Sequence, residues 1–445
     1  MENGENKTDN RVDKRALRRK RRLRNQIMAY ITMLIVLAVI AMGGFFAVRY
    51  IMDRMEKQPQ EQPAEDIKQQ VNDLINEPEI SQPDPEEYVP ELTAEEKLDG
   101  IVDAAIEAMP LEEKVAGLFF VTPEAITGVD TAVKAGDGTK DALNANPVGG
   151  LIYFKKNIKS QEQLAEMIAN SLSYSRYPLF IAVDEEGGTV SRVADSGIGT
   201  NVGKASDIGA TGDPANAYNA GQTIAGYLTP LGFNVDFAPV ADINNVEGSV
   251  IGSRSYGSDP NMVASMVSSM VKGLEENGVS ACLKHFPGIG SSTEDTHDGM
   301  ADTDRTAEEF RAEEFVVFQA GIDSGVDFIM ITHMMAPGLT GDEIPVPSVF
   351  SKTIVTDILR NELHFNGVII TDALNMTVIT EYYDSGDAAV RALKAGCDML
   401  LMPEDYKAAY EAVLAAVQDG TISEERINDS LRRIYRIKYA DILDD

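Results

Sequence analysis

Cysteine and positive charge are the two things that this chain has little of. It holds two cysteines, Cys282 and Cys397, each inside an apolar strand-like run, so we expect buried thiols rather than a disulfide or a metal pair. No metal-ligand spacing and no thiol-nucleophile motif occurs, and no metal or cofactor is expected. The 39 lysines and arginines are outnumbered by 71 aspartates and glutamates, and this net charge of −32 argues against nucleic-acid binding, which needs clustered basic side chains.

The basic residues that do cluster stand before a long apolar run. Residues 14–24 carry eight basic side chains, and residues 27–48 contain no charge over 22 positions, enough to cross the ~30 Å hydrocarbon layer of a membrane. The positive-inside rule predicts a cytoplasmic tail at 1–26, one membrane-spanning anchor at 27–48 and an extracytoplasmic remainder, located at the cell membrane. A cleaved signal peptide is the main alternative, and a buried core helix is a weaker one.

After the anchor, the composition changes twice. Residues 49–95 are rich in Glu, Gln, Pro and Asp, a composition that cannot bury enough apolar surface to fold, so we expect a disordered acidic linker. Residues 96–445 are numerous enough for one large folded domain.

Short apolar runs alternate with helical segments throughout residues 96–445. This pattern is typical of parallel strands that are buried on both faces and joined by crossover helices, as expected at 160–172 and 351–363. Eight such units predict an α/β fold, a (β/α)8 TIM-type barrel; a doubly wound open sheet is the alternative, but no G-x-G-x-x-G turn follows the first strand. The expected strands are 117–121, 149–154, 178–184, 233–239, 280–286, 327–333, 367–372 and 397–403.

Polar side chains fall at or near the carboxyl ends of five of these strands. In a barrel, the loops at this end carry the chemistry. One aspartate at such a place could be a helix N-cap, but the convergence of several polar residues is harder to explain by capping. The residues are Asp184, Asp236, Lys284, His285, His333 and Asp372.

Two segments carry a specific signature. Residues 283–300 read LKHFPGIGSSTEDTHDGM, which resembles the K-H-F-P-G-H-G…D-S-H signature of family 3 glycoside hydrolases in their β-N-acetylglucosaminidase subgroup. Residues 368–376 read VIITDALNM, which resembles the nucleophile segment of that family. The resemblance implies a (β/α)8 barrel that releases terminal β-linked N-acetylglucosamine from cell-wall-type glycans or muropeptides with retention of configuration. Further matching segments follow in family order at 109–121, 149–157, 182–193, 232–243 and 251–260.

The resemblance implies catalytic roles for three residues. Asp372 would be the nucleophile that forms a covalent glycosyl-aspartate intermediate. His297 would be the acid/base, assisted by Asp295 two positions earlier. An imidazole suits this task because it titrates near neutral pH and so donates and then recovers a proton. Alternatives are a simple turn for the Asp-Thr-His segment and a helix N-cap for Asp372.

The resemblance also implies five sugar-binding residues. They have charged or polar side chains, which make strong and directional hydrogen bonds to sugar hydroxyls. A structural ion pair stays open for either arginine, as does a core position for the histidine. The five residues are Asp184, Arg192, Arg254, Lys284 and His285.

Four positions depart from the family pattern. Ile289 stands where a second histidine is usual, Ser291 where an aspartate follows it, Glu185 where glutamine is common and Thr189 where arginine is common. These departures put in doubt the geometry of the 283–300 loop and the substrate preference, rather than the proposed catalytic residues.

Other functions remain open. A β-glucosidase-like hydrolase of this family usually takes its acid from a second domain, whereas a β-N-acetylglucosaminide phosphorylase would use phosphate in place of water. A non-catalytic glycan-binding membrane protein is the alternative of another class, and Ile289 and Ser291 are its best support. The expected partners are a carbohydrate substrate and the membrane, with no nucleic acid; the sequence does not fix the oligomeric state.

Overall fold

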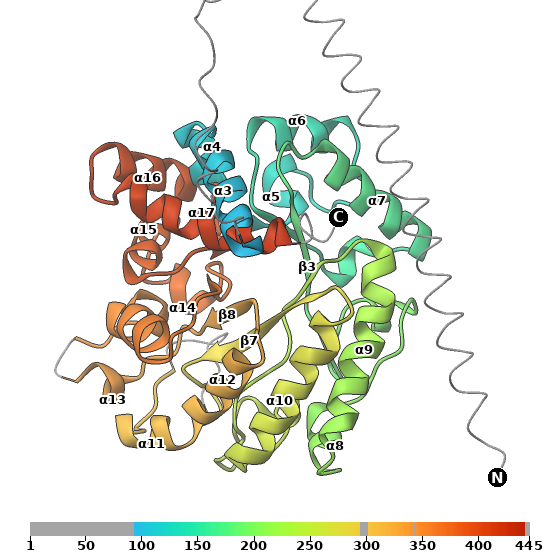
Figure 1. Ribbon diagram of the computed structural model, residues 1–445, viewed down its shortest axis with the longest axis vertical. Helices are drawn as coiled ribbons and strands as arrows, with labels where there is room; N and C mark the ends of the chain where they lie inside the picture. Colours follow the sequence, from blue (N-terminus) through green and yellow to red (C-terminus); the bar gives the residue numbers. More distant parts are fainter. Residues whose placement is uncertain (1–92, 294–300, 342–343, 441–445) are drawn as a thin grey trace, which may run out of the picture. The chain divides into compact units, whose positions relative to one another are not determined.

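Eight parallel strands form the centre of the fold in the computed structural model, which describes residues 93–293, 301–341 and 344–440 (Figure 1). Neighbouring strands pair in the order β10-β1-β2-β3-β6-β7-β8-β9. A parallel bridge between Ile370 and Met399 joins the two end strands, so the sheet is nearly closed into a barrel. The strands are β1 (Phe119–Val121), β2 (Gly150–Ile152), β3 (Phe180–Val183), β6 (Val235–Asp236), β7 (Ser280–Phe286), β8 (Phe328–Ile331), β9 (Val368–Thr371) and β10 (Leu400–Leu401).

Each of these strands lies inside a segment predicted from the sequence. The predicted α/β barrel is therefore confirmed for the described residues. The prediction succeeded because strands covered on both faces are continuous apolar runs, and every residue of β1, β2, β3, β8 and β9 is indeed buried. One pair was not predicted: β4 (Glu185–Gly187) and β5 (Val190–Ser191) form an antiparallel hairpin after β3.

Helices surround the barrel (Figure 1). The helical segment predicted at 160–172 is α7, and the one predicted at 351–363 is the π-helix η5. The longer helices are α3 (Ala94–Glu107), α6 (Asp137–Ala145), α7 (Gln161–Tyr174), α9 (Pro214–Leu231), α10 (Pro260–Glu275), α12 (Glu314–Asp323), η5 (Thr353–Glu362), α15 (Ser385–Ala395), α16 (Tyr406–Gln418) and α17 (Glu424–Lys438). The shorter ones are α4 (Leu111–Ala116), α5 (Pro123–Thr127), η1 (Lys155–Asn157), η2 (Ala194–Ser196), α8 (Ala205–Gly209), η3 (Gly252–Arg254), α11 (Ala307–Ala312), α13 (Pro337–Thr340), η4 (Ser348–Phe350) and α14 (Thr377–Thr380).

The two helices that flank β6 in the chain show how local sequence sets their ends. The side chains of Asp213 and Asp259 cap α9 and α10, and a proline follows each aspartate at the first helical position. Helix α9 ends at Gly232, whose φ of 96° favours glycine. The two helices pack closely, because a Cβ atom on Gly221 would lie 2.7 Å from the carbonyl oxygen of Met270.

Aromatic side chains fill the barrel interior. The ring of Phe120 is stacked on that of Phe180, with centroids 6.3 Å apart, and meets Phe237 edge-on at 5.4 Å. Phe180 in turn meets Phe328 at 5.1 Å. All four side chains are buried, so the barrel is a packed core rather than a pore, and space for a ligand must lie at its ends.

A buried carboxylate strengthens the joint between β9 and β10. Asp398 is fully buried, and its Oδ2 accepts hydrogen bonds from the backbone N–H of Ile369 at 3.0 Å and from Arg360 at 2.6 Å. Its Oδ1 accepts from Ser430 at 2.7 Å and from Arg433 at 3.1 Å. Burial would raise the pKa of Asp398, but the surrounding arginines lower it, so this carboxylate is charged and paired.

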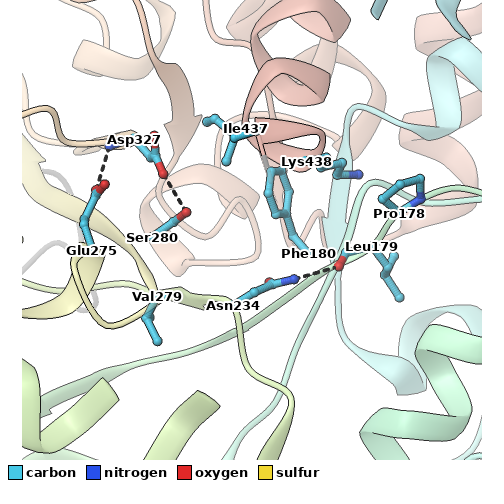
Figure 2. Close-up of a pocket in the computed structure, with 12 residues that line it drawn as sticks. Pro178, Leu179, Phe180, Asn234, Glu275, Val279, Ser280, Asp327, Ile437 and Lys438 are labelled. Atoms are coloured by element: carbon cyan, nitrogen blue, oxygen red, sulfur yellow. Dashed lines mark hydrogen bonds between the residues drawn. The ribbon is translucent and has the colours of Figure 1, made fainter. Parts of the chain in front are cut away.

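The amino-terminal end of the barrel holds a cavity of about 240 Å³ (Figure 2). On one side, Glu275 accepts a hydrogen bond from the backbone N–H of Asp327 at 3.1 Å, and Ser280 donates to the Asp327 side chain at 2.6 Å. Burial beside Asp327 raises the pKa of Glu275 to about 8. On the other side, the Lys438 ammonium lies 4.6 Å from the ring centre of Phe180, which favours its charged form, whereas burial lowers its pKa to about 7.

The predicted single-pass membrane location is corrected here. Among the residues that the structure describes, no helix combines the length and the apolar character that crossing a bilayer requires. Helix α17, for example, places Leu431 in the core and Arg432 on the outside. The predicted tail and anchor at 1–26 and 27–48 lie outside the described residues, as does the predicted linker up to residue 92. The last residues assigned to the linker, 93–95, instead form the N-cap and the first turn of helix α3.

The pair at the amino-terminal end of the barrel makes stability depend on pH. Glu275 has a higher pKa in the folded chain than its ordinary 4.5, so ionising it costs stability as pH rises from about 5 to about 8. Glu275→Gln keeps an acceptor for the two backbone N–H groups that Glu275 binds but cannot ionise. We expect the variant to melt at a temperature higher than the parent by roughly 1–3 °C at about pH 8, with a smaller difference at about pH 5.

Glu276→Gln is the matched control, because it removes the same charge from an exposed neighbouring position. Melting temperatures of the three proteins, measured by circular dichroism across this pH range, check the expectation. A Glu275→Gln curve that runs parallel to that of the parent would contradict it.

Candidate functional site

The opposite end of the barrel, at the carboxyl ends of the strands, brings together most of the predicted site residues. Lys284, late in β7, donates a hydrogen bond to Asp184, just after β3, over 2.8 Å. The Lys284 ammonium also lies 2.7 Å from a carboxylate oxygen of Glu186 in β4. Glu186 in turn binds both Nε and Nη2 of Arg254, at 2.8 and 2.7 Å. Four charged side chains from separate segments thus form one buried network.

Glu186 is the centre of this network, and the sequence analysis missed it. Burial alone would raise the pKa of Glu186, but Lys284 and Arg254 lower it to about 2. Burial likewise acts to lower the pKa of Lys284, yet Asp184 and Glu186 raise it above its ordinary value. Glu186, Lys284 and Arg254 are therefore ionised. The signal in the sequence was the spacing, since Glu186 stands two residues after Asp184 in AVDEEGG.

His285 has an aspartate partner of its own. Its Nδ1 lies 2.7 Å from Oδ2 of Asp242, and the same oxygen accepts the His285 backbone N–H at 3.1 Å. Asp242 is fully buried, and the sequence analysis did not single it out. The sequence left open a core position for His285. The structure agrees in that this residue is buried, with 6% of its surface exposed.

Asp372 stands directly after β9, half-buried, and accepts a hydrogen bond from the backbone N–H of Ala373 at 2.7 Å. Burial would raise the pKa of Asp372, but the nearby charges of His333, His285 and Lys284 lower it below its ordinary value. His333 is itself fixed by a contact of 2.9 Å between its Nε2 and the carbonyl oxygen of Ala373. The arrangement presents an ionised carboxylate at the end of the barrel, which is the state a nucleophile needs.

Arg192 follows the β4–β5 hairpin and differs from the other predicted arginine. Its guanidinium lies 6.0 Å from the ring centre of Phe154, and no ion pair joins it to another of the described residues. Glu185 fixes the backbone beside it, accepting hydrogen bonds from the N–H groups of Val193 and Ala194 at 2.7 and 2.9 Å. The sequence left open a structural ion pair for either arginine. Among the described residues, Arg254 forms such a pair and Arg192 does not.

The departures from the family pattern have local explanations. Ile289 is buried, and its backbone N–H donates to Oδ1 of Asp242 at 2.7 Å, so the main chain is fixed without a polar side chain there. The Ser291 hydroxyl lies 3.0 Å from that of Thr303, which joins the two sides of the loop at its base. Burial raises the pKa of Glu185, which also accepts from a tyrosine hydroxyl, whereas Thr189 is exposed in the hairpin turn.

The glycines of KHFPGIG are explained by close packing. Gly288 has a φ of 130°, and a Cβ atom there would lie 2.6 Å from Cγ of Glu314 at the start of α12. A Cβ atom on Gly290 would lie 1.8 Å from the carbonyl oxygen of Ile243. Any larger residue at either position would displace the loop.

The predicted acid/base pair cannot be placed. Asp295 and His297 lie outside the described residues, which stop at Thr293 and resume at Ala301. Within the described residues, no group of three histidine, cysteine or acidic side chains has the arrangement of a metal site. Both cysteines are free and buried, as predicted.

The central position of Glu186 predicts a large effect of its removal. Glu186→Gln would leave the Lys284 and Arg254 charges without their shared partner, and we expect a loss of about 3–5 kcal/mol in the free energy of unfolding. Asp387→Asn is the control, because it breaks an exposed pair with Arg391 and should cost roughly 0.2–1 kcal/mol. Urea denaturation of both variants and the parent measures the difference. Equal losses in the two variants would show that the buried network is not stabilising.

Comparisons with known proteins agree on one family. The sequence model described as "Glycosyl hydrolase family 3 N terminal domain" matches residues 110–437. A β-hexosaminidase of Idiomarina loihiensis is 37% identical over 297 residues, which cover 66% of this chain and 88% of the relative. A β-hexosaminidase of Stenotrophomonas maltophilia is 34% identical over 285 residues, covering 62% of this chain and 82% of the relative.

A solved structure agrees with these relatives. The glycoside hydrolase family 3 β-N-acetylglucosaminidase of Paenibacillus sp. str. FPU-7 superimposes with a TM-score of 0.71 at 36% identity, covering 76% of this chain and 64% of that one. The chain therefore belongs to glycosyl hydrolase family 3 and is a glycoside hydrolase of the β-N-acetylhexosaminidase type.

Proposed function

We propose that the enzyme is a retaining β-N-acetylglucosaminidase that releases terminal β-linked N-acetylglucosamine through a covalent intermediate on Asp372. The observation that carries this proposal is the electrostatic setting of Asp372. Its carboxylate sits at the carboxyl end of the barrel, and the neighbouring side chains of His333, His285 and Lys284 lower its pKa, so that it is ionised despite burial. An ionised carboxylate beside the sugar both attacks the anomeric carbon and stabilises positive charge on the ring.

In the first step, an Asp372 oxygen forms a bond to the anomeric carbon as the bond to the leaving oxygen breaks. The leaving oxygen takes a proton from His297, which Asp295 orients. In the second step, His297 takes a proton from water as the water oxygen attacks the anomeric carbon and releases Asp372. The assignments of His297 and Asp295 rest on the sequence resemblance in the Asp-Thr-His segment.

The sugar is bound by the charged network. Asp184, Lys284 and Arg254 have fixed positions through Glu186, so their remaining hydrogen-bonding capacity is aimed in constant directions. Arg192 has no ion partner among the described residues and lies beside an aromatic ring, which leaves its guanidinium available to a ligand. We assign these four residues and His285 to sugar hydroxyls and the N-acetyl group.

We propose a cell-wall fragment with a terminal β-linked N-acetylglucosamine, such as a muropeptide, as the natural substrate. The support is the resemblance to family members that act on muropeptides. Phosphorolysis is the competing reaction, because a histidine acid/base repels an approaching phosphate less than a carboxylate would. Product analysis with and without inorganic phosphate separates the two: hydrolysis gives the free sugar, and phosphorolysis gives the sugar 1-phosphate.

Replacement of the nucleophile should remove turnover but not binding. Asp372→Asn retains the shape and the acceptor for the Ala373 N–H but not the charge. We expect hydrolysis of nitrophenyl β-N-acetylglucosaminide and of muropeptides to fall by on the order of 10³-fold or more. Mass spectrometry of the parent enzyme, quenched during turnover, should find one N-acetylglucosamine on the peptide that contains Asp372. Parent-like activity in the variant would reject this residue as the nucleophile.

The loss of activity on replacing the acid/base residue should depend on the leaving group of the substrate. His297→Ala removes the proton donor. A sugar leaving group depends strongly on protonation, whereas nitrophenolate departs with little need of it. We expect turnover of a disaccharide or muropeptide to fall by about 10²–10⁴-fold and that of the nitrophenyl substrate by clearly less. His364→Ala is the control, since this histidine lies at the amino-terminal end of the barrel. Equal losses on both substrates would contradict the role of His297.

A further inference from the structure

We propose that Asp242 is a positioning residue that fixes the proton of His285 on Nδ1, so that Nε2 faces the sugar as a hydrogen-bond acceptor whenever the ring is neutral. The inference rests on the proposed function for the contact between His285 and the sugar. Asp242 itself touches no substrate and acts through the imidazole ring.

The geometry leaves little choice of tautomer. Nδ1 of His285 lies 2.7 Å from Oδ2 of Asp242, a short contact between a ring nitrogen and a carboxylate oxygen. Both carboxylate oxygens of Asp242 already accept backbone N–H groups, from His285 at 3.1 Å and from Ile289 at 2.7 Å. Because both oxygens act as acceptors in these contacts, we assign the donor role, and hence the proton, to the ring nitrogen that faces Oδ2. This is true of both the neutral and the charged ring.

The orientation of the ring follows from the same contacts. With Nδ1 directed at a fully buried carboxylate, the other ring nitrogen points away from Asp242. The ring lies close enough to Asp372 for its charge to influence that carboxylate. Nε2 is therefore the nitrogen that faces a sugar hydroxyl. In a neutral ring this nitrogen carries no proton, so it accepts a hydrogen bond from the hydroxyl.

Asp242 also couples the ring to the adjacent main chain. Its Oδ1 accepts the Ile289 N–H, whereas its Oδ2 takes both contacts from His285, so one rigid carboxylate sets the spacing between ring and loop base. This explains how Ile289 substitutes for the usual histidine without loss of the local main-chain contact. These three contacts hold the buried Asp242 carboxylate in one orientation.

The tautomer is measurable without turnover. The chain has four histidines, so a two-dimensional nitrogen–hydrogen correlation spectrum of protein labelled with ¹⁵N at histidine is simple, and His285→Ala identifies the signals of His285 by their loss. In the parent at alkaline pH, we expect the His285 ring to show a protonated Nδ1 and an unprotonated Nε2. A neutral ring that carries its proton on Nε2 would overturn the proposal. Ser255→Ala, which removes a hydrogen bond to the Asp242 carbonyl and leaves the carboxylate contacts, should keep the parent pattern.

A double-mutant cycle tests whether Asp242 acts through His285. We expect kcat/KM on the nitrophenyl substrate to fall about tenfold or more in Asp242→Asn, and the double variant with His285→Ala to lose clearly less than the product of the two single losses. Losses that multiply would overturn the proposal. The spectrum requires only the parent and His285→Ala, so an Asp242 variant that fails to fold leaves the decisive measurement intact. Its result also stands apart from the Asp372→Asn assay, which tests the proposed function.

Discussion

The site depends on the pairing of a buried lysine and a partly buried arginine with one carboxylate whose side chain is buried. Lys284 and Arg254 both come close to the Glu186 carboxylate, and Lys284 also pairs with Asp184. Charges removed from water are costly unless they are matched within a few ångströms, so these four side chains fix one another. Because they come from the end of β3, from β4, from η3 and from β7, the network also fixes the relative positions of four segments at the carboxyl end of the barrel.

In the same region, the pKa values of carboxyl groups are shifted in two opposite directions. Asp372 and Glu186 have lowered pKa values, because cations surround them. Burial raises the pKa of Asp236 well above its usual range and also raises that of Glu185, and both serve as acceptors for backbone N–H groups. Only the first kind suits chemistry that needs negative charge, and the second kind suits structural support. Burial and neighbouring charge, rather than residue type, decide between the two.

Much of this could be read from the sequence, and the reasons are physical. The eight strands were predictable because a strand buried on both faces is a continuous apolar run, and Asp184, Lys284 and Asp372 were found because they follow or end such runs. Glu186 and Asp242 were missed because their importance comes from partners distant in sequence, such as Arg254, which no periodicity reveals. The β4–β5 hairpin was missed because it is short and rich in glycine and charge. The membrane location came from the amino-terminal composition and finds no support in the described helices.

The buried cluster around Asp398 has a consequence for the position of Asp372. The barrel closes between β9 and β10, and there the Asp398 carboxylate joins the Ile369 N–H to arginines of two helices. Mobile ions screen exposed pairs strongly but reach a fully buried carboxylate poorly. The contacts that hold β9, which leads directly to Asp372, should therefore be as strong in concentrated salt as in dilute buffer, and the position of the Asp372 carboxylate should not depend on ionic strength.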